Sequence, residues 1–84
     1  MSAFEQRRVA KAFGAVLKTA RRHVGISQEH LAELADIDCT YPSLLERGLR
    51  QLTIGRVIAI AYALRLEPGE PVTMTVARLR GDKS

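Results

Sequence analysis

The residue types that most often carry catalysis or bind metals are few in this sequence, and their spacing fits neither task. His23, His30 and Cys39 are scattered and lack the ligand spacing of a zinc site. Ser27 and Ser43 lie in no nucleophile motif, and the chain has no glycine-rich phosphate loop. A solvated helix face and a helix cap explain the nearby acidic residues better than an acid–base pair does: Glu29, Glu33, Asp36 and Asp38. The sequence therefore predicts a protein that is not an enzyme and uses no metal or cofactor.

The order of charges along the chain says more than its net charge of +4. Residues 5–25 carry six basic and one acidic side chain, and residues 26–46 carry five acidic and no basic ones. Residues 47–84 carry seven basic and three acidic side chains. This order predicts a basic surface assembled from separate segments, which suits an anionic partner.

The length and the cysteine content indicate how many domains the protein has and in which cellular compartment it works. A chain of 84 residues is enough for one domain with a modest core, so self-association is a further source of stability. Cys39 is the only cysteine, so no internal disulfide can form, which fits a reducing cytoplasm. The longest apolar run, residues 57–64, falls short of the ~20 residues of a membrane span. We therefore expect a cytoplasmic protein with no membrane contact.

Apolar spacings of three and four residues predict two helices in the first half of the chain. The first covers residues 8–23, and Gly25 can supply the positive φ that ends it. Ser27 is a good N-cap for the second, over residues 28–35, with Leu31, Leu34 and Ala35 facing inward.

Two more helices are expected after a tight link at residues 36–38. Asp38 is a natural N-cap for a helix over residues 39–47, which Gly48 ends. Thr53 can cap a fourth helix over residues 54–64, whose inward side is expected to contain Ile54, Val57, Ile58, Ala61 and Leu64.

The segment over residues 72–80 fits two patterns. Val72, Val76 and Leu79 form a helix face, whereas Val72, Met74 and Val76 alternate as in a strand. We prefer the helix. The apolar residues of this segment, with Ile60 and Tyr62 of the fourth helix, are the candidate dimer surface, and the alternative is that they only close the core of the monomer: Ile60, Tyr62, Val72, Met74, Val76 and Leu79.

Two short helices joined by a turn of three or four residues are the geometric unit of the helix-turn-helix. Here that unit carries the runs Gly25-Ile-Ser-Gln-Glu-His-Leu-Ala-Glu-Leu-Ala35 and Thr40-Tyr-Pro-Ser-Leu-Leu-Glu-Arg-Gly48. Together they resemble the Cro and phage-repressor-like (XRE-type) helix-turn-helix family over about residues 10–70, and among its members short stand-alone regulators such as restriction–modification controllers. The resemblance implies an all-α, lambda-repressor-like fold in one domain, with a core over residues 8–66 and a C-terminal segment over residues 67–84 as a possible dimerisation element.

The resemblance also implies roles for individual residues. Gln28, at the start of the first motif helix, is expected to hold a phosphate. The outward positions of the recognition helix match Cys39, Thr40, Ser43 and Leu44, of which Thr40 and Ser43 suit base edges and Leu44 a thymine methyl group. Arg47 and Arg50 suit phosphate contacts, and Arg21 with Glu46 is expected to form a partly buried structural ion pair.

Two departures from the family pattern affect the recognition helix. Pro42 stands where relatives carry a residue with an N–H, so the helix either loses its first hydrogen bond or starts nearer Thr40. A later start would move Cys39 out of the base-reading set. The outward face also lacks Arg, Lys, Gln and Asn, so specificity is expected to be modest, to be mediated by water, or to be read through DNA shape.

The interpretation that follows is a sequence-specific transcription regulator, of bacterial or phage origin, that binds a (pseudo)palindromic operator as a homodimer. Two alternatives stay open. One is an antitoxin whose main task is to block a toxin, and the other is a protein–protein adaptor that has lost DNA binding. The antitoxin alternative suggests a toxin as protein partner, and the regulator hypothesis suggests RNA polymerase.

Overall fold

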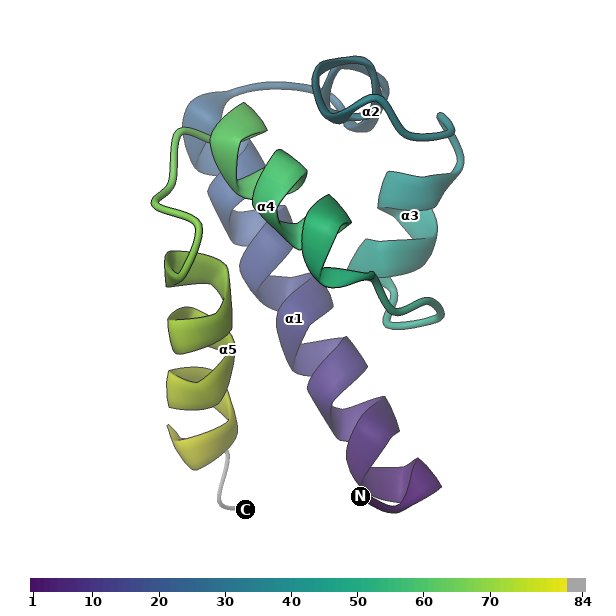
Figure 1. The fold of residues 1–84 in the computed structure, drawn as a ribbon, viewed down its shortest axis with the longest axis vertical. Coiled ribbons are helices and arrows are strands. Elements are labelled where there is room, and N and C mark those ends of the chain that lie inside the picture. Colours follow the sequence, from purple (N-terminus) through teal and green to yellow (C-terminus); the bar gives the residue numbers. More distant parts are fainter. Residues whose placement is uncertain (82–84) are drawn as a thin grey trace.

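The computed structural model describes residues 1–81, and that part of the chain folds into five helices without a strand (Figure 1). The helices are α1 (Ala3–Val24), α2 (Gln28–Ala35), α3 (Tyr41–Glu46), α4 (Ile54–Ala63) and α5 (Glu70–Gly81). The predicted all-α fold is confirmed, and residues 72–80 are helical. The last residues of the predicted C-terminal segment, 82–84, lie outside the described residues.

Helix α1 forms the long axis of the molecule. Its 22 residues, at about 1.5 Å per residue, match the 34 Å extent of the fold. It begins five residues earlier than the apolar pattern predicts, because Ser2 and Glu5 form a capping box. The Glu5 N–H donates to Ser2 Oγ at 3.1 Å, and the Ser2 N–H donates to Glu5 Oε1 at 3.4 Å. Gly25, with φ 85°, ends the helix as predicted.

The core lies where α1, α2, α3 and α4 meet. Leu31, Leu45 and Ile60 are fully buried at its centre and come from α2, α3 and α4, respectively. Ile60 is 1% exposed, so its predicted place in a dimer surface is wrong: the side chain packs in the core of the monomer. The expectation that Leu34 faces inward is wrong, because the buried side of α2 consists of Leu31, Ala32 and Ala35.

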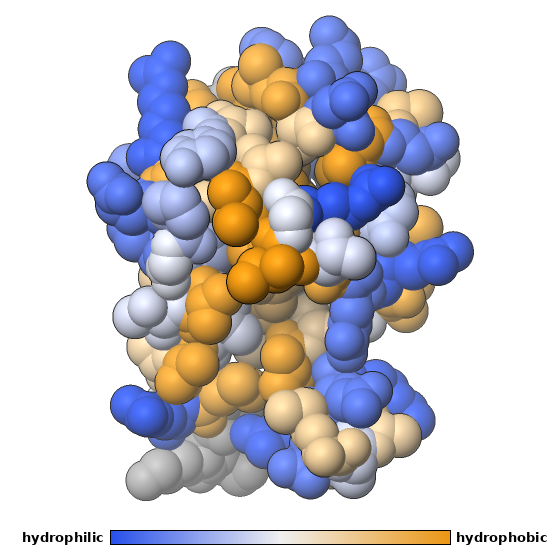
Figure 2. All heavy atoms as spheres, viewed as in Figure 1, coloured by the Kyte–Doolittle hydropathy of each residue, from blue (hydrophilic) through white to orange (hydrophobic). Residues whose placement is uncertain are grey.

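Helix α4 leaves an apolar stripe uncovered. Ile54, Ile58 and Tyr62 follow one another at spacings of four residues, so they share one side of the helix. Ile54 is 80% exposed and Tyr62 is 66% exposed, and Ile58 between them is exposed as well. The expectation that Ile54 and Ile58 face the core is therefore wrong. Figure 2 shows apolar side chains gathered in a band on this face, over α4 and toward α5.

Helix α5 runs back beside α1, with its last turns toward the N-terminal end of α1 (Figure 1). Thr75 is its buried polar residue, and its hydroxyl donates to the Pro71 carbonyl oxygen at 2.7 Å, so no polar group is left unsatisfied there. Within residues 1–81, none of the helices is long and apolar enough to cross a membrane.

Candidate nucleic-acid interface

Helices α2 and α3 are joined by a tight turn with capped ends. Ser27 Oγ accepts from the His30 N–H at 3.0 Å and starts α2 as predicted. Asp36 ends α2 in the left-handed conformation, with φ 55°, and the Ile37 N–H donates to the Ala32 carbonyl oxygen at 3.0 Å. The five residues between the helices therefore follow a fixed path.

The recognition helix α3 starts at Tyr41, which is later than an N-cap at Asp38 would give. Pro42 is its second residue, where a backbone N–H has no partner within the helix, so the missing donor costs nothing. The later of the two predicted starts is therefore the one observed. Cys39 lies exposed in the turn before the helix.

Asp38 caps the turn locally and leaves the helix itself without a side-chain cap. Its Oδ1 accepts from the Thr40 hydroxyl at 2.6 Å and from the Thr40 N–H at 2.8 Å. The hydroxyl bond, and after it the backbone bond, lowers the pKa of Asp38, which stays ionised. An ionised carboxylate only accepts hydrogen bonds, so the Thr40 hydroxyl donates its hydrogen bond to Asp38 and keeps its lone pairs for another donor.

A half-buried ion pair ties α1 to α3. Arg21 Nε donates to Glu46 Oε2 at 2.6 Å and Arg21 Nη2 donates to Glu46 Oε1 at 3.1 Å. Arg21 Nη1 also donates to the Ile26 carbonyl oxygen at 2.8 Å, before α2. The side chains of Arg21 and Glu46 are 12% and 3% exposed, respectively. The hydrogen bond with Glu46 raises the pKa of Arg21, against the opposing effect of burial.

Gln28 joins this network. Its Nε2 donates to Glu46 Oε1 at 3.0 Å, so the first residue of α2 is held to the last residue of α3. An amide nitrogen carries two hydrogens, and one remains for another acceptor. The side chain that the sequence places against a phosphate is thus oriented by Glu46.

The other predicted DNA-binding residues lie around the outer edge of α3. Thr40, Arg47 and Arg50 are exposed, and Ser43 and Leu44 are half-buried. Leu45 and Pro42 occupy the inner side of the helix and are buried. The geometry thus brings a short polar edge to the surface, flanked by two arginines at the end of the helix.

The comparisons with known proteins agree with this geometry. The sequence pattern described as a helix-turn-helix domain matches residues 12–73 of the chain. The chain belongs to the helix-turn-helix family. It is a DNA-binding transcription regulator of the XRE type, and regulators of this kind bind double-stranded DNA.

Solved structures show the same relationship. The restriction-modification controller protein C.AhdI from Aeromonas hydrophila is 37% identical, with a TM-score of 0.71, over 74% of this chain and 94% of that one. The controller protein C.Esp1396I is 29% identical, with a TM-score of 0.77, over 86% and 95% of the two chains. The clp gene regulator ClgR from Corynebacterium glutamicum, 24% identical over 86% and 77% of the two chains with a TM-score of 0.80, shares the fold. No curated protein matches the sequence.

The sequence did not predict one contact between the recognition helix and α4. The Arg56 guanidinium lies 5.4 Å from the centre of the Tyr41 ring, within the range of a cation–π interaction. It connects the first turn of α4 to the first residue of α3. No local spacing indicates this pair, since the two residues are fifteen positions apart and meet only through the fold.

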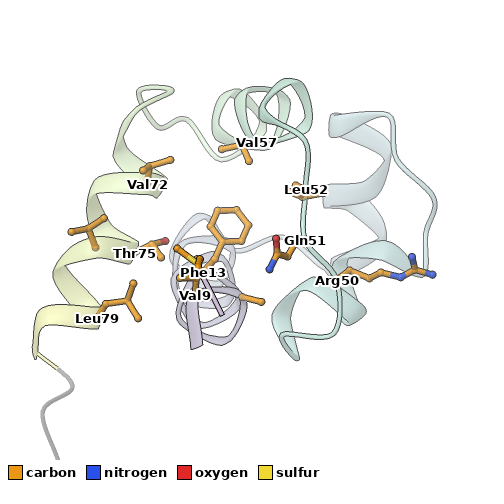
Figure 3. A pocket seen from close by; sticks show the side chains of 12 residues that line it. Val9, Phe13, Arg50, Gln51, Leu52, Val57, Val72, Thr75 and Leu79 are labelled. Carbon is orange, nitrogen blue, oxygen red and sulfur yellow. The ribbon is translucent and has the colours of Figure 1, made fainter. Parts of the chain in front are cut away.

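The regulator also has an apolar groove of about 360 Å³ beside α1, away from α2 (Figure 3). In the close view Val9 and Phe13 of α1 lie between Val72 and Leu79 of α5 and the segment with Leu52. Val72 and Val76 therefore face partly toward the monomer, as the alternative to a dimer surface required, although both stay exposed.

Proposed function

We propose that the protein regulates transcription as a homodimer that binds a (pseudo)palindromic operator, with α3 of each protomer in the major groove. The observation that supports this most is the bonded set Arg21–Glu46–Gln28, which fixes α2 and α3 against α1. Two helices held in one orientation can present the same edge to every half-site.

Thr40, Ser43 and Leu44 contact the base edges in the major groove. The Thr40 hydroxyl donates its hydrogen bond to Asp38, so its oxygen offers only acceptor lone pairs to a base in the major groove. The major-groove donors are the amino groups of adenine and cytosine, so we expect one of these opposite Thr40. Ser43 accepts or donates, and Leu44 suits a thymine methyl group. Cys39, before the helix, contacts DNA from the turn.

The DNA backbone is held at both ends of the motif. Gln28 donates its remaining amide hydrogen to a phosphate at the start of α2, where the helix N-terminus adds a favourable dipole. Arg47 and Arg50, both exposed, contact phosphates beyond the end of α3.

Dimerisation uses the apolar face of α4 and α5. The uncovered side chains there are Ile54, Ile58, Tyr62, Val72, Met74 and Val76. Leu79 is half-buried and lines the groove beside them. Burying this face against a second copy removes apolar surface from water. A dimer that reads two half-sites one turn of the duplex apart needs its recognition helices about 34–36 Å apart.

Selection of binding sites from random DNA, followed by alanine substitutions, tests this proposal. We expect the wild-type protein to select a two-fold symmetric site, and the double variant Thr40→Ala/Ser43→Ala to lose the preference for it over scrambled DNA. Thr19→Ala, an exposed threonine on α1, is the matched control and should bind as the wild type does. A double variant with undiminished preference would contradict base reading by Thr40 and Ser43, and a wild-type protein that selects no site would favour the adaptor.

A further inference from the structure

We propose that the first half of α1 joins the DNA interface: Arg7 and Arg50 together hold a backbone phosphate that lies outside the bases α3 reads. The ligand is a phosphodiester group of duplex DNA flanking the half-site. This inference rests on the proposed operator binding and adds a contact from a helix that the motif does not include.

Arg7 and Arg50 line the same depression on the surface. It measures about 260 Å³ and lies between the start of α1 and the turn that follows α3. Arg7 comes from the helix, Arg50 from the turn, and both side chains are exposed. The remaining lining residues carry no charge: Ala3, Gln6, Ala10, Gly48, Leu49 and Gln51. The lining thus contributes two arginines and no carboxylate.

The turn is fixed against α1, so the backbone holds both arginines at the edge of the same depression. Gln51 Nε2 donates to the Gln6 carbonyl oxygen at 3.2 Å. Gly48, with φ 72°, sits so close to α1 that a Cβ on it would lie 2.8 Å from Lys11 Cγ and 3.0 Å from Lys11 Cα. Two like charges thus flank one depression whose lining contains no carboxylate, and a phosphate bound between them would reduce their repulsion.

The position of this depression suits the DNA backbone. Arg50 lies four residues beyond the end of α3, in the turn that leaves the recognition helix. A guanidinium offers paired N–H donors that match two phosphate oxygens, so two of them can hold one phosphodiester group. Within residues 1–81 the ion pair is that of Arg21 with Glu46, which leaves the charges of Arg7 and Arg50 for the ligand.

Arg7→Gln tests the proposal, with Arg8→Gln as the matched control. Arg8 is the next residue of α1 and equally charged, but it lines other depressions together with Leu79 of α5. Because Arg50 remains beside the phosphate, we expect Arg7→Gln to flatten the plot of log affinity against log salt by up to about 0.9 for each protomer, or up to about 1.8 for a dimer. Affinity should fall equally for operator and scrambled DNA, because a phosphate carries no sequence information. Arg8→Gln should keep the wild-type slope.

A scan of the operator with neutral methylphosphonate linkages locates the phosphate. One linkage outside each half-site should weaken binding by the wild-type protein more than it weakens binding by Arg7→Gln, which keeps only Arg50 at that phosphate. If Arg7→Gln matches Arg8→Gln in slope and in the scan while the wild type binds its operator, this inference fails and the regulator proposal stands. If the wild type binds an acidic protein segment and no DNA, both fail. Both substituted side chains are exposed, so unchanged thermal unfolding is the expected check on folding.

Discussion

Gly14 of α1 lies directly against the backbone of Leu45 in α3: a β-carbon at Gly14 would stand 2.3 Å from the Leu45 carbonyl oxygen and 2.9 Å from that of Glu46. Backbone atoms cannot move aside as the end of a flexible side chain can. The missing side chain at Gly14 therefore sets how closely the recognition helix approaches the helix that supports it.

Gly14→Ala should accordingly destabilise the protein by about 1–3 kcal/mol, through overpacking. Gly55→Ala is the matched control, because a β-carbon there meets no atom within 4 Å and Gly55 lies in the first turn of α4. Alanine favours helix over glycine by up to about 1 kcal/mol, so this control should be neutral or stabilising. Urea unfolding measures both changes. Equal stabilisation by the two substitutions would show that α1 and α3 are not in such contact.

Removing one partner of the Arg21–Glu46 pair should destabilise the protein strongly, and replacing both partners by apolar residues should destabilise it much less. Arg21→Met leaves the Glu46 carboxylate buried without its cation, and we expect the free energy of unfolding to fall by about 3–5 kcal/mol. The double variant Arg21→Met/Glu46→Leu removes both charges and should be much less destabilised. A double-mutant cycle from urea unfolding checks this. Additive effects of the two single substitutions would mean that the ions contribute independently.

Asp38 should show the pH dependence of a carboxylate that the fold keeps charged. The Thr40 hydroxyl and backbone bonds lower its folded-state pKa below the unfolded value of about 4. Its contribution to stability is therefore present above about pH 4 and is lost as the pH falls through the folded-state pKa. In an NMR titration Thr40→Val should raise the pKa of Asp38, and Thr19→Val should not. An unchanged pKa of Asp38 in Thr40→Val would contradict the hydrogen bond from the Thr40 hydroxyl to this carboxylate.

The uncovered stripe of α4 should control self-association. Placing a carboxylate in a buried apolar interface is costly, so Tyr62→Glu should raise the Kd of the dimer at least about tenfold. Thr19→Glu adds the same charge to an exposed part of α1 and serves as the control. Sedimentation equilibrium over a concentration series gives both constants. A Tyr62→Glu protein that dimerises like the control would move the interface elsewhere.

Local signals in the sequence were enough to predict α2 and the glycine that ends α1. Ser27 and Gly25 act through groups within three or four residues, so their roles are visible without the fold. The start of α1 also had a local signal, since Ser2 and Glu5 have capping-box spacing, but the apolar pattern begins later and hid it. The start of α3 depended on Pro42, which rules out an early helix more strongly than Asp38 favours one.

The sequence could not separate the two sides of α4. Residues 57–64 are apolar throughout, so periodicity does not distinguish the buried Ile60 from the exposed stripe with Ile58. Tertiary packing alone decides which side is covered. The same holds for the depression at Arg7 and Arg50, because these residues are 43 positions apart and only the contact of the Gly48 turn with α1 brings them together.

The most direct test of operator recognition through α3 is a fluorescence-anisotropy titration of the wild-type protein against its selected operator and a scrambled duplex, over a series of salt concentrations. We expect tight binding to the operator that resists scrambled competitor, with log affinity falling linearly and steeply against log salt as bound phosphates release counter-ions. Equal affinity for operator and scrambled DNA, or affinity that does not change with salt, would contradict a regulator that reads bases through α3 and is anchored on phosphates.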